Sequence, residues 1–477
     1  MSKSYEKIFE KVLKKIKPKK DEKEKMENLA RKSLGIAEKE AKKFSAKAML
    51  AGSITRDTWL PGKLEFDVFI LFPEEMDEKD MEKYGLEIGK KVIRQLKGKW
   101  KIEYAEHPYV HGEAEGVDID IVPAYELKSL EKIKSAVDRT PFHVRYMEKN
   151  LSINQSDQVR LLKQFLKAID AYGADAKTLG LSGYSCELLI IKYKNFLETL
   201  KAISKWSPGE IIDIENFYNP KDYPKLRKNF KYHPLILIDP TDKNRNTASA
   251  LSTEKFFRII KHAKNFLEAP SENLFFKKPI KPITEKELLK HLKHRKTQLL
   301  IIKFTPPKAV PDVIWPQLRK FANRLQSILE ETKYEFKVFG KDVYTNEKDL
   351  AIVLLEMEIF ELPFIQKRIG PIVFDLDDSK RFLDKYKNSA LSLYVENNFW
   401  VAEIRRKFLT AKDKLIDSLN KDLEILKAKG IPNLIAEQIS KKGFQVFYGL
   451  KKIYNLTKKD KNFGMFLRNY FEKESLV

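Results

Sequence analysis

The sequence predicts an α+β protein with about three domains, and three observations support this prediction. The chain has 477 residues, which at roughly 150 residues per domain corresponds to about three domains. Hydrophobic residues make up 43% of the chain, which is enough for packed cores and excludes a wholly disordered protein. Strand-like and amphipathic helical segments alternate at both ends of the chain, and a mostly helical region lies between them.

A first domain of mixed helix and sheet is predicted over residues 1–150. Apolar residues at helical spacing predict two amphipathic helices before residue 47, separated at Pro18. Their many lysines are more typical of a solvated face than of a site. Apolar and alternating segments then predict the strands of a small sheet: residues 64–72, 100–110 and 112–125.

A helical second domain is predicted over residues 151–265 and an α+β third domain over residues 266–477. The segment 268–287 contains three prolines and is the best candidate for a linker. A continuous helix is predicted over residues 186–200. An earlier helix carries a basic stripe, which is usually a solvated face, formed by Arg160, Lys163 and Lys167.

The charge balance predicts an anionic partner. The chain has 91 Lys and Arg against 68 Asp and Glu, a formal net charge of +23, and nucleic acid is the usual partner of such a protein. No uncharged apolar run approaches the roughly 18 residues of a membrane span, and the N-terminus lacks the apolar region of a secretory signal. The single cysteine, Cys186, fits a reducing compartment. We therefore expect a cytoplasmic protein without a membrane partner.

The most informative block is Gly52-Ser53-x-x-Arg56 followed by Glu65-x-Asp67. In a strand, residues i and i+2 point to the same face, so Glu65 and Asp67 place two carboxylates side by side. Two neighbouring carboxylates repel each other, and the positive charge of a bound Mg²⁺ offsets this repulsion. Mg²⁺ also prefers hard oxygen ligands such as these. Gly52 and Ser53 lie where a strand turns into a helix, which suits close approach of a phosphate, and Arg56 can add a charge-assisted contact.

A third carboxylate would complete a site for two metal ions. Asp118 and Asp120 share one face of a later strand and both qualify. Glu-x-Asp alone is more often an exposed strand face than a metal site, whereas the whole combination in one small domain is far more specific. His107 and His111 have the spacing of a zinc pair on a helix, but Pro108 and Gly112 argue against a helix, so we reject a zinc site there.

These motifs resemble those of the archaeal-type (class I) CCA-adding enzymes, tRNA nucleotidyltransferases of the DNA polymerase β superfamily. The resemblance is carried by GSITRDTWLPGKLEFDVFILFPEE, YAEHPYVHGEAEGVDIDIVPAY and SAVDRTPFHVRY. It continues through VRLLKQFLKAIDAYGADAKTLGLSGYSCELLI and IDPTDKNRNTASALS. The resemblance implies a polymerase-β-like nucleotidyltransferase head, a helical central domain that binds the nucleotide and the tRNA 3′ end, and an α+β C-terminal tRNA-binding region.

The resemblance also implies roles for individual residues. The catalytic, metal-binding carboxylates would be Glu65, Asp67 and Asp120, of which Asp120 would help to deprotonate the tRNA 3′-hydroxyl. Triphosphate and ribose contacts would come from Ser53, Arg56, His143, Lys163 and Tyr172. Arg245 would read the incoming base together with the tRNA backbone. From the residues alone, a lone histidine such as His143 is more often a structural residue than a site residue, and Tyr172 would pass as a packing residue.

The function implied is template-independent addition of C, C and A to the 3′ end of tRNA from CTP and ATP with Mg²⁺, with release of pyrophosphate. The C-terminal region would bind the acceptor stem and the T-loop. A first alternative is another template-independent RNA nucleotidyltransferase, such as a poly(A) polymerase or an oligoadenylate synthetase-like enzyme. A second is a tRNA-binding protein that has lost catalysis. The oligomeric state stays open, with a homodimer as one candidate.

Overall fold

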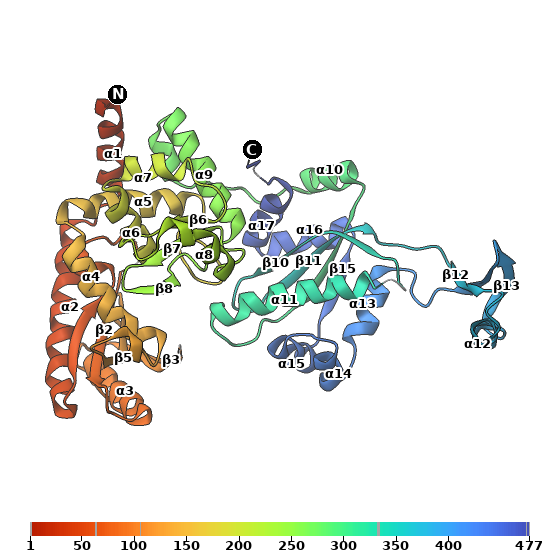
Figure 1. The fold of residues 1–477 in the computed structure, drawn as a ribbon, viewed down its shortest axis with the longest axis horizontal. Helices are drawn as coiled ribbons and strands as arrows, with labels where there is room; N and C mark the ends of the chain where they lie inside the picture. Colours follow the sequence, from red (N-terminus) through yellow and green to blue (C-terminus); the bar gives the residue numbers. More distant parts are fainter. Residues whose placement is uncertain (1, 63, 105, 332–333, 474, 477) are drawn as a thin grey trace. The chain divides into compact units, whose positions relative to one another are not determined.

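The computed structural model describes residues 2–62, 64–104, 106–331, 334–473 and 475–476 and divides into two compact units. Unit 1 comprises Met1–Lys278 with Leu476–Val477, and unit 2 comprises Pro279–Ser475. Both units contain helices and sheets (Figure 1), so the predicted α+β class is confirmed. The boundary falls inside the proline-containing segment 268–287, while the further division of unit 1 at residue 150 stays a prediction.

The two N-terminal helices are confirmed as α1 (Ser2–Ile16) and α2 (Lys20–Ala41). Pro18 lies between them because it cannot continue a helix. Phe9 of α1 packs edge-on against Phe196, with ring centroids 5.3 Å apart, which joins this helix to the helical part of unit 1. The apolar side of α2 packs instead into the core of the first sheet through Met26, Leu29 and Ala37.

The first sheet has five strands in the order β1-β2-β5-β4-β3. Their bounds are β1 (Lys47–Ala51), β2 (Glu65–Pro73), β3 (Lys99–Tyr104), β4 (Pro108–Ala114) and β5 (Val117–Glu126). β2 and β5 pair in parallel, whereas the other neighbours are antiparallel. The helix α3 (Glu78–Gln95) follows β2 and packs on β4 and β5 through Gly85 and Gly89, where a Cβ would lie within 2.6–2.7 Å of Pro123 and Val110.

Two strand predictions in this sheet are wrong. Residues 100–110 form two antiparallel strands, β3 and β4, and the predicted strand 112–125 is interrupted after Ala114. Glu115 and Gly116 both have positive φ, 52° and 73°, as a two-residue hairpin turn requires. The turn was missed because glutamate rarely occupies the left-handed region.

The helical part of unit 1 surrounds an aromatic core that includes Phe165, Phe196 and Phe266. The predicted helix 186–200 is wrong in its continuity, because Lys194 leaves the helical conformation and Asn195 caps a new helix by accepting from the Glu198 backbone N–H. The helices are α4 (Thr140–Asn150), α5 (Ser156–Ala168), α6 (Gly183–Tyr193), α7 (Phe196–Ile203), α8 (Tyr223–Asn229) and α9 (Thr253–Glu268). A small sheet in the order β6-β7-β8 comprises Glu210–Ile212, Leu235–Asp239 and Asp242–Asn246.

Unit 2 contains a four-stranded sheet in the order β10-β11-β9-β15 and a three-stranded sheet in the order β12-β14-β13. The strands are β9 (Gln298–Phe304), β10 (Lys337–Thr345), β11 (Ala351–Ile359), β12 (Ile365–Ile372), β13 (Ala390–Glu396), β14 (Phe399–Arg405) and β15 (Gln445–Tyr448). The helices are α10 (Glu285–Arg295), α11 (Pro311–Leu329), α12 (Leu376–Tyr386), α13 (Ala411–Leu419), α14 (Leu423–Ala428), α15 (Asn433–Lys442), α16 (Leu450–Lys459) and α17 (Lys461–Phe471).

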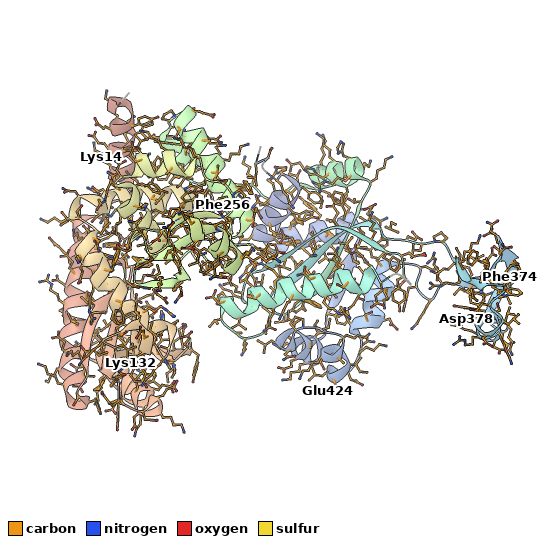
Figure 2. The ribbon with its side chains drawn as sticks, viewed as in Figure 1. Lys14, Lys132, Phe256, Phe374, Asp378 and Glu424 are labelled. Carbon is orange, nitrogen blue, oxygen red and sulfur yellow. The ribbon has the colours of Figure 1, made fainter. Side chains whose placement is uncertain are left out.

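Each unit has fully buried and largely exposed apolar side chains. Phe256 of α9 is fully buried in the core of unit 1, whereas Phe374, between β12 and α12, is 76% exposed (Figure 2). None of the described helices combines the length and the apolar character that are needed to cross a membrane.

A buried carboxylate connects three elements of unit 2. Glu356 of β11 has no exposed surface and accepts hydrogen bonds from Thr297 Oγ1 at 2.6 Å, Tyr470 OH at 2.8 Å and Arg295 Nη1 at 3.0 Å. A buried carboxylate needs such donors because desolvation disfavours its charge. Gly340 makes room for the network, since a Cβ there would lie 2.4 Å from the Tyr470 hydroxyl.

We therefore expect Glu356→Ala to lower the free energy of unfolding of unit 2 by about 3 kcal/mol, because it leaves three donors without their acceptor. Urea denaturation of the full chain, followed by circular dichroism, measures this loss. The matched control is Glu358→Ala on the same strand, where the side chain is 45% exposed and forms an ion pair with Lys337. This control should change stability by less than about 1 kcal/mol. Equal losses for the two variants would contradict the structural role of Glu356.

Candidate active site

Two parallel strands bring the three predicted metal-binding carboxylates together. The register of β2 against β5 pairs Glu65 with Asp118 and Asp67 with Asp120. Side chains two residues apart in a strand, and those paired across parallel strands, point to the same face. Glu65, Asp67 and Asp120 therefore share one face of the sheet with Asp118 as a fourth carboxylate.

A histidine that was not predicted as a site residue holds Asp120. His111 lies opposite Asp120 in the antiparallel β4–β5 pair, and its Nδ1 is 2.7 Å from Asp120 Oδ1. Burial raises the pKa of Asp120, and the hydrogen bond with His111 opposes that rise. The other ring nitrogen of His111, Nε2, is 3.8 Å from Asp118 Oδ1, so one histidine ring contacts both candidate aspartates. The strand register that reveals this contact depends on the hairpin turn that was missed.

His107, the other member of the rejected zinc pair, has different partners. Its Nδ1 lies 3.2 Å from Glu82 and 3.4 Å from Glu78, both on α3. Among the described residues, Glu78, Glu82 and His107 bring potential metal-ligating atoms within 4.8 Å of one another. This group is separate from the predicted carboxylates, and Glu78 is largely exposed to solvent.

The predicted carboxylates suit a divalent cation in chemistry and in space. All of them offer hard oxygen atoms, which Mg²⁺ prefers. Gly52 has a φ of +82°, and a Cβ at this position would lie 3.0 Å from Asp67 Oδ2. A side chain at position 52 would therefore crowd the Asp67 carboxylate and any ion bound to it.

The Gly-Ser segment begins a short 3₁₀ helix, η2 (Ser53–Arg56), directly after β1. The sequence correctly placed a helical turn after the strand, although the turn is only four residues long. Arg56 in this turn donates from Nε to Glu187 Oε2 at 3.1 Å and from Nη1 to Thr55 Oγ1 at 2.7 Å. Ser53 thus follows Gly52, which lies next to Asp67, and Arg56 ends the turn against Glu187.

Glu187 is a buried carboxylate that was missed by the sequence analysis. It lies on α6, is 1% exposed, and accepts from Thr58 Oγ1 at 2.6 Å in addition to Arg56. Lys163 Nζ is 3.5 Å from its Oε1. The only local signal is a single acid inside the otherwise apolar run CELLII, which is the pattern of a charge paired in a core.

The basic stripe of α5 is not solvated at Arg160 and Lys163, so that prediction is wrong for both. Lys163 is 1% exposed and donates to the carbonyl oxygen and the hydroxyl of Thr58, each at 3.1 Å. Burial lowers the pKa of Lys163, and the nearby Glu187 carboxylate opposes this. Arg160 is also buried, donates to the Trp59 carbonyl at 3.1 Å and pairs with Asp57. The turn after η2 needs these donors, and Lys167 alone of the stripe stays exposed.

Tyr172 and Lys163 lie close together, and both approach Gly183, the first residue of α6. A Cβ at Gly183 would lie 3.3 Å from the Tyr172 hydroxyl and 3.5 Å from Lys163 Nζ, so glycine permits this approach. Burial raises the pKa of Tyr172, and the charges of Glu187 and Glu65 add to the effect. Tyr172 therefore lies near Lys163, the partner of Glu187.

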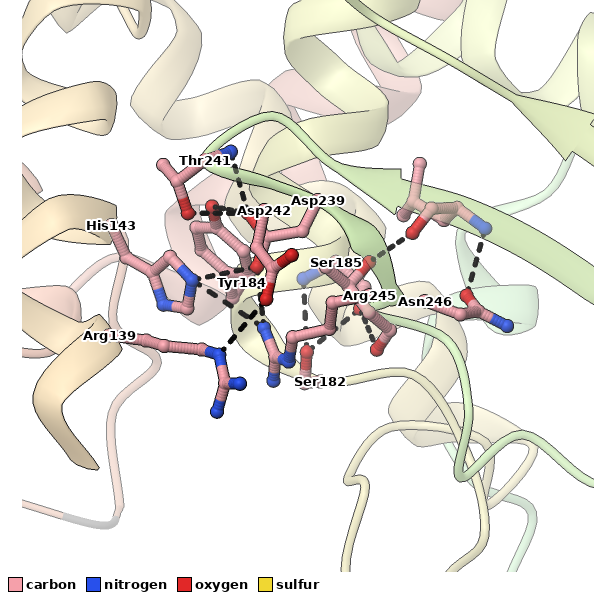
Figure 3. Close-up of polar contacts among 12 residues, drawn as sticks. Arg139, His143, Ser182, Tyr184, Ser185, Asp239, Thr241, Asp242, Arg245 and Asn246 are labelled. Atoms are coloured by element: carbon pink, nitrogen blue, oxygen red, sulfur yellow. Dashed lines mark hydrogen bonds and ion pairs between the residues drawn. The ribbon is translucent and has the colours of Figure 1, made fainter. Parts of the chain in front are cut away.

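His143 and Arg245 meet at a second buried carboxylate, Asp239 (Figure 3). Asp239 Oδ2 is 2.8 Å from His143 Nε2 and 2.7 Å from Arg245 Nη1. Burial alone would raise the pKa of Asp239, but hydrogen bonds from His143, Thr241 and Arg245 outweigh it and lower the pKa. His143 comes from α4 and Arg245 from β8, so the two predicted nucleotide-binding residues are joined only in the folded chain.

Helix α6 connects the two clusters. Tyr184 donates its hydroxyl to Asp239 Oδ1 at 3.2 Å, and Glu187, three residues later, holds Arg56. Residues three apart lie on neighbouring parts of one helical face. The structure thus groups the predicted nucleotide-binding residues into two sets along this helix: Ser53, Arg56, Lys163 and Tyr172 in one, and His143 and Arg245 in the other.

Three family models match successive parts of the chain. Residues 31–143 match the nucleotidyltransferase domain, residues 157–276 the second domain of tRNA nucleotidyltransferase, and residues 295–449 the C-terminal domain of the CCA-adding enzyme. The first match contains the three carboxylates, and the second contains Lys163, Tyr172 and Arg245.

Several curated proteins are similar to this chain over most of its length. The CCA-adding enzyme of Methanosarcina mazei is 39% identical over 423 residues, which cover 88% of each chain. That of Archaeoglobus fulgidus is 38% identical over 76% of this chain and 79% of its own. That of Methanopyrus kandleri is 33% identical over 99% of this chain and 98% of its own. The resemblance found in the motifs is confirmed, and the chain belongs to the family of archaeal CCA-adding enzymes.

Proposed function

We propose that this protein adds C, C and A to the 3′ end of tRNA from CTP and ATP, without a nucleic-acid template and with release of pyrophosphate. The observation that carries the proposal is the parallel register of β2 and β5, which aligns Asp67 with Asp120 in a chain of this family. That register supports the proposal, because two-metal nucleotidyl transfer needs several carboxylates on one face. A tRNA-binding protein without catalysis would not need these carboxylates on one face.

Glu65, Asp67 and Asp120 would hold Mg²⁺ in this proposal. When bound, the ion would neutralise phosphate charge and stabilise the attacking and leaving oxygens. Asp120 would accept the proton of the tRNA 3′-hydroxyl, and His111, bound to Asp120 Oδ1, would orient the carboxylate. The in-line attack on the α-phosphate would then release pyrophosphate.

The two clusters along α6 would bind the nucleotide. Ser53 and Arg56 would contact the triphosphate, with Tyr172 close to the ribose. Lys163 is buried against Thr58, so we infer that it acts by balancing the charge of Glu187 and fixing the segment that carries Arg56. His143 would contact a phosphate, and Arg245, which is 39% exposed, would face the incoming base.

Unit 2 would bind the tRNA acceptor stem and T-loop. Its last helices, α15 to α17, carry exposed lysines that suit phosphate contacts. A net charge of +23 means that tRNA binding should weaken strongly with salt. The family match over residues 295–449 favours this reading over a poly(A) polymerase or an oligoadenylate synthetase-like enzyme. A homodimer and a cytoplasmic location remain predictions of the same proposal.

The order of nucleotide addition tests the proposal. The purified chain is offered tRNAs that end before CCA, after C and after CC, each with Mg²⁺ and either CTP or ATP. We expect CTP alone to add two residues to the first tRNA and one to the second, and ATP to add a single residue to the third. An open-ended A tail would indicate a polymerase instead, and no incorporation would indicate a binding protein.

The carboxylates are tested by Asp67→Asn and Asp120→Asn. Each should reduce single-nucleotide incorporation by at least about 10³-fold, because a missing metal ligand removes transition-state stabilisation of several kcal/mol. Filter binding should show tRNA affinity within about threefold of the parent protein.

The control for these variants is Glu126→Gln, at the far end of β5, where the carboxylate forms an ion pair with Lys47. It should keep full incorporation. If Asp67→Asn reduced tRNA affinity as strongly as it reduces nucleotide incorporation, the Asp67 carboxylate would be structural.

A further inference from the structure

We propose that Asp239 is a positioning residue that holds His143 and Arg245 in one fixed arrangement and so sets how strictly the enzyme selects the incoming base. This inference rests on the proposed function of the site. It concerns a residue of the segment IDPTDKNRNTASALS to which the resemblance assigned no role.

The Asp239 carboxylate is immobilised by its surroundings (Figure 3). It has no exposed surface and lies at the end of β7, where the chain turns into β8. Its Oδ1 accepts from the Thr241 backbone N–H at 2.9 Å, from Thr241 Oγ1 at 2.8 Å and from the Tyr184 hydroxyl at 3.2 Å. Three donors on one oxygen, from two elements, fix the plane of the carboxylate.

The second oxygen, Oδ2, faces the two predicted nucleotide-binding side chains. It accepts from His143 Nε2 at 2.8 Å and from Arg245 Nη1 at 2.7 Å. An ionised carboxylate only accepts, so it requires the hydrogen of His143 to be on Nε2 and leaves Nδ1 for another contact. The ring is further held by stacking on Tyr184, with centroids 4.2 Å apart.

Arg245 gains a defined orientation from the same contact. The guanidinium is planar and rigid, so one short ion pair through Nη1 restricts the direction of its remaining donors. The side chain is 39% exposed, in contrast to the buried carboxylate that holds it. A base that pairs with this oriented edge is favoured over one that does not, and a freely rotating arginine would lose that discrimination.

A nearby aspartate provides a matched control. Asp242 pairs with Asp239 across the β7–β8 hairpin and forms an ion pair with Arg139 at 3.3 Å. Among the described residues, no hydrogen bond or ion pair joins the Asp242 side chain to His143 or to Arg245. Loss of its charge therefore reports on the hairpin and on local electrostatics without releasing the two nucleotide-binding side chains.

The test compares Asp239→Asn and Asp242→Asn in single-nucleotide addition to tRNA lacking CCA, with CTP, UTP and ATP each supplied alone. We expect Asp239→Asn to lower the ratio of kcat/KM for CTP to that for UTP or ATP by at least about tenfold, with tRNA affinity unchanged. Asp242→Asn should keep the parental ratio. An equal loss with all three nucleotides, or an unchanged ratio in Asp239→Asn, would overturn the proposal.

A double-variant comparison shows whether Asp239 acts through Arg245. Arg245→Ala should reduce the nucleotide ratio about tenfold in the parent and less than about twofold in the Asp239→Asn background. A full additional effect in that background would overturn the proposal. Failure of the parent protein to add CCA would instead reject the proposed function, and the parent is therefore assayed in parallel.

If Asp239→Asn does not fold, Tyr184→Phe provides a second test of the same proposal. It removes one donor to Oδ1 and retains the ring that stacks on His143. We expect this variant to shift the nucleotide ratio in the same direction by about threefold, with an unchanged circular dichroism spectrum. A parental ratio in folded Tyr184→Phe would count against the proposal.

Discussion

Two buried carboxylates, Glu187 and Asp239, hold the candidate active site together. A charge removed from water is tolerated only when donors replace the lost hydration, and each of these carboxylates binds donors from segments far apart in the chain. Glu187 joins α6 to the turn after β1, and Asp239 joins the β7–β8 hairpin to α4. The cationic side chains that would meet a nucleotide are therefore also the ones that make the buried carboxylates tolerable.

This dual use explains why the basic residues of the site are less exposed than their sequence pattern indicates. Lys163 lies on a stripe that resembles a solvated face, yet the carbonyl of Thr58 and the carboxylate of Glu187 draw it into the interior. The acidic residues of the site are brought together in a different way, by the pairing of two strands. Parallel pairing brings four carboxylates to one side of the sheet, where His111 contacts Asp120 and Gly52 leaves space beside Asp67.

Much of the fold was predictable from local patterns. The two N-terminal helices, the turn after β1 and the acidic strands follow from periodicity and from the special conformations of proline and glycine. The errors occurred where one residue interrupts a continuous pattern. Glu115 adopts a left-handed conformation in a hairpin turn, and Asn195 caps a new helix inside an apolar run. Both are local features, but the alternating or apolar pattern around them continues past the break and hides it.

The sequence by itself determined the α+β class, the acidic strand motif and the likeness to CCA-adding enzymes, because periodicity and motif spacing are local properties. Only the tertiary structure decided which residues support the site. Arg56 and Glu187 are 131 residues apart, and His143 and Asp239 are 96 residues apart. Neither pair has a local pattern, because the need of a buried charge for a partner can be met from any segment that the fold brings near.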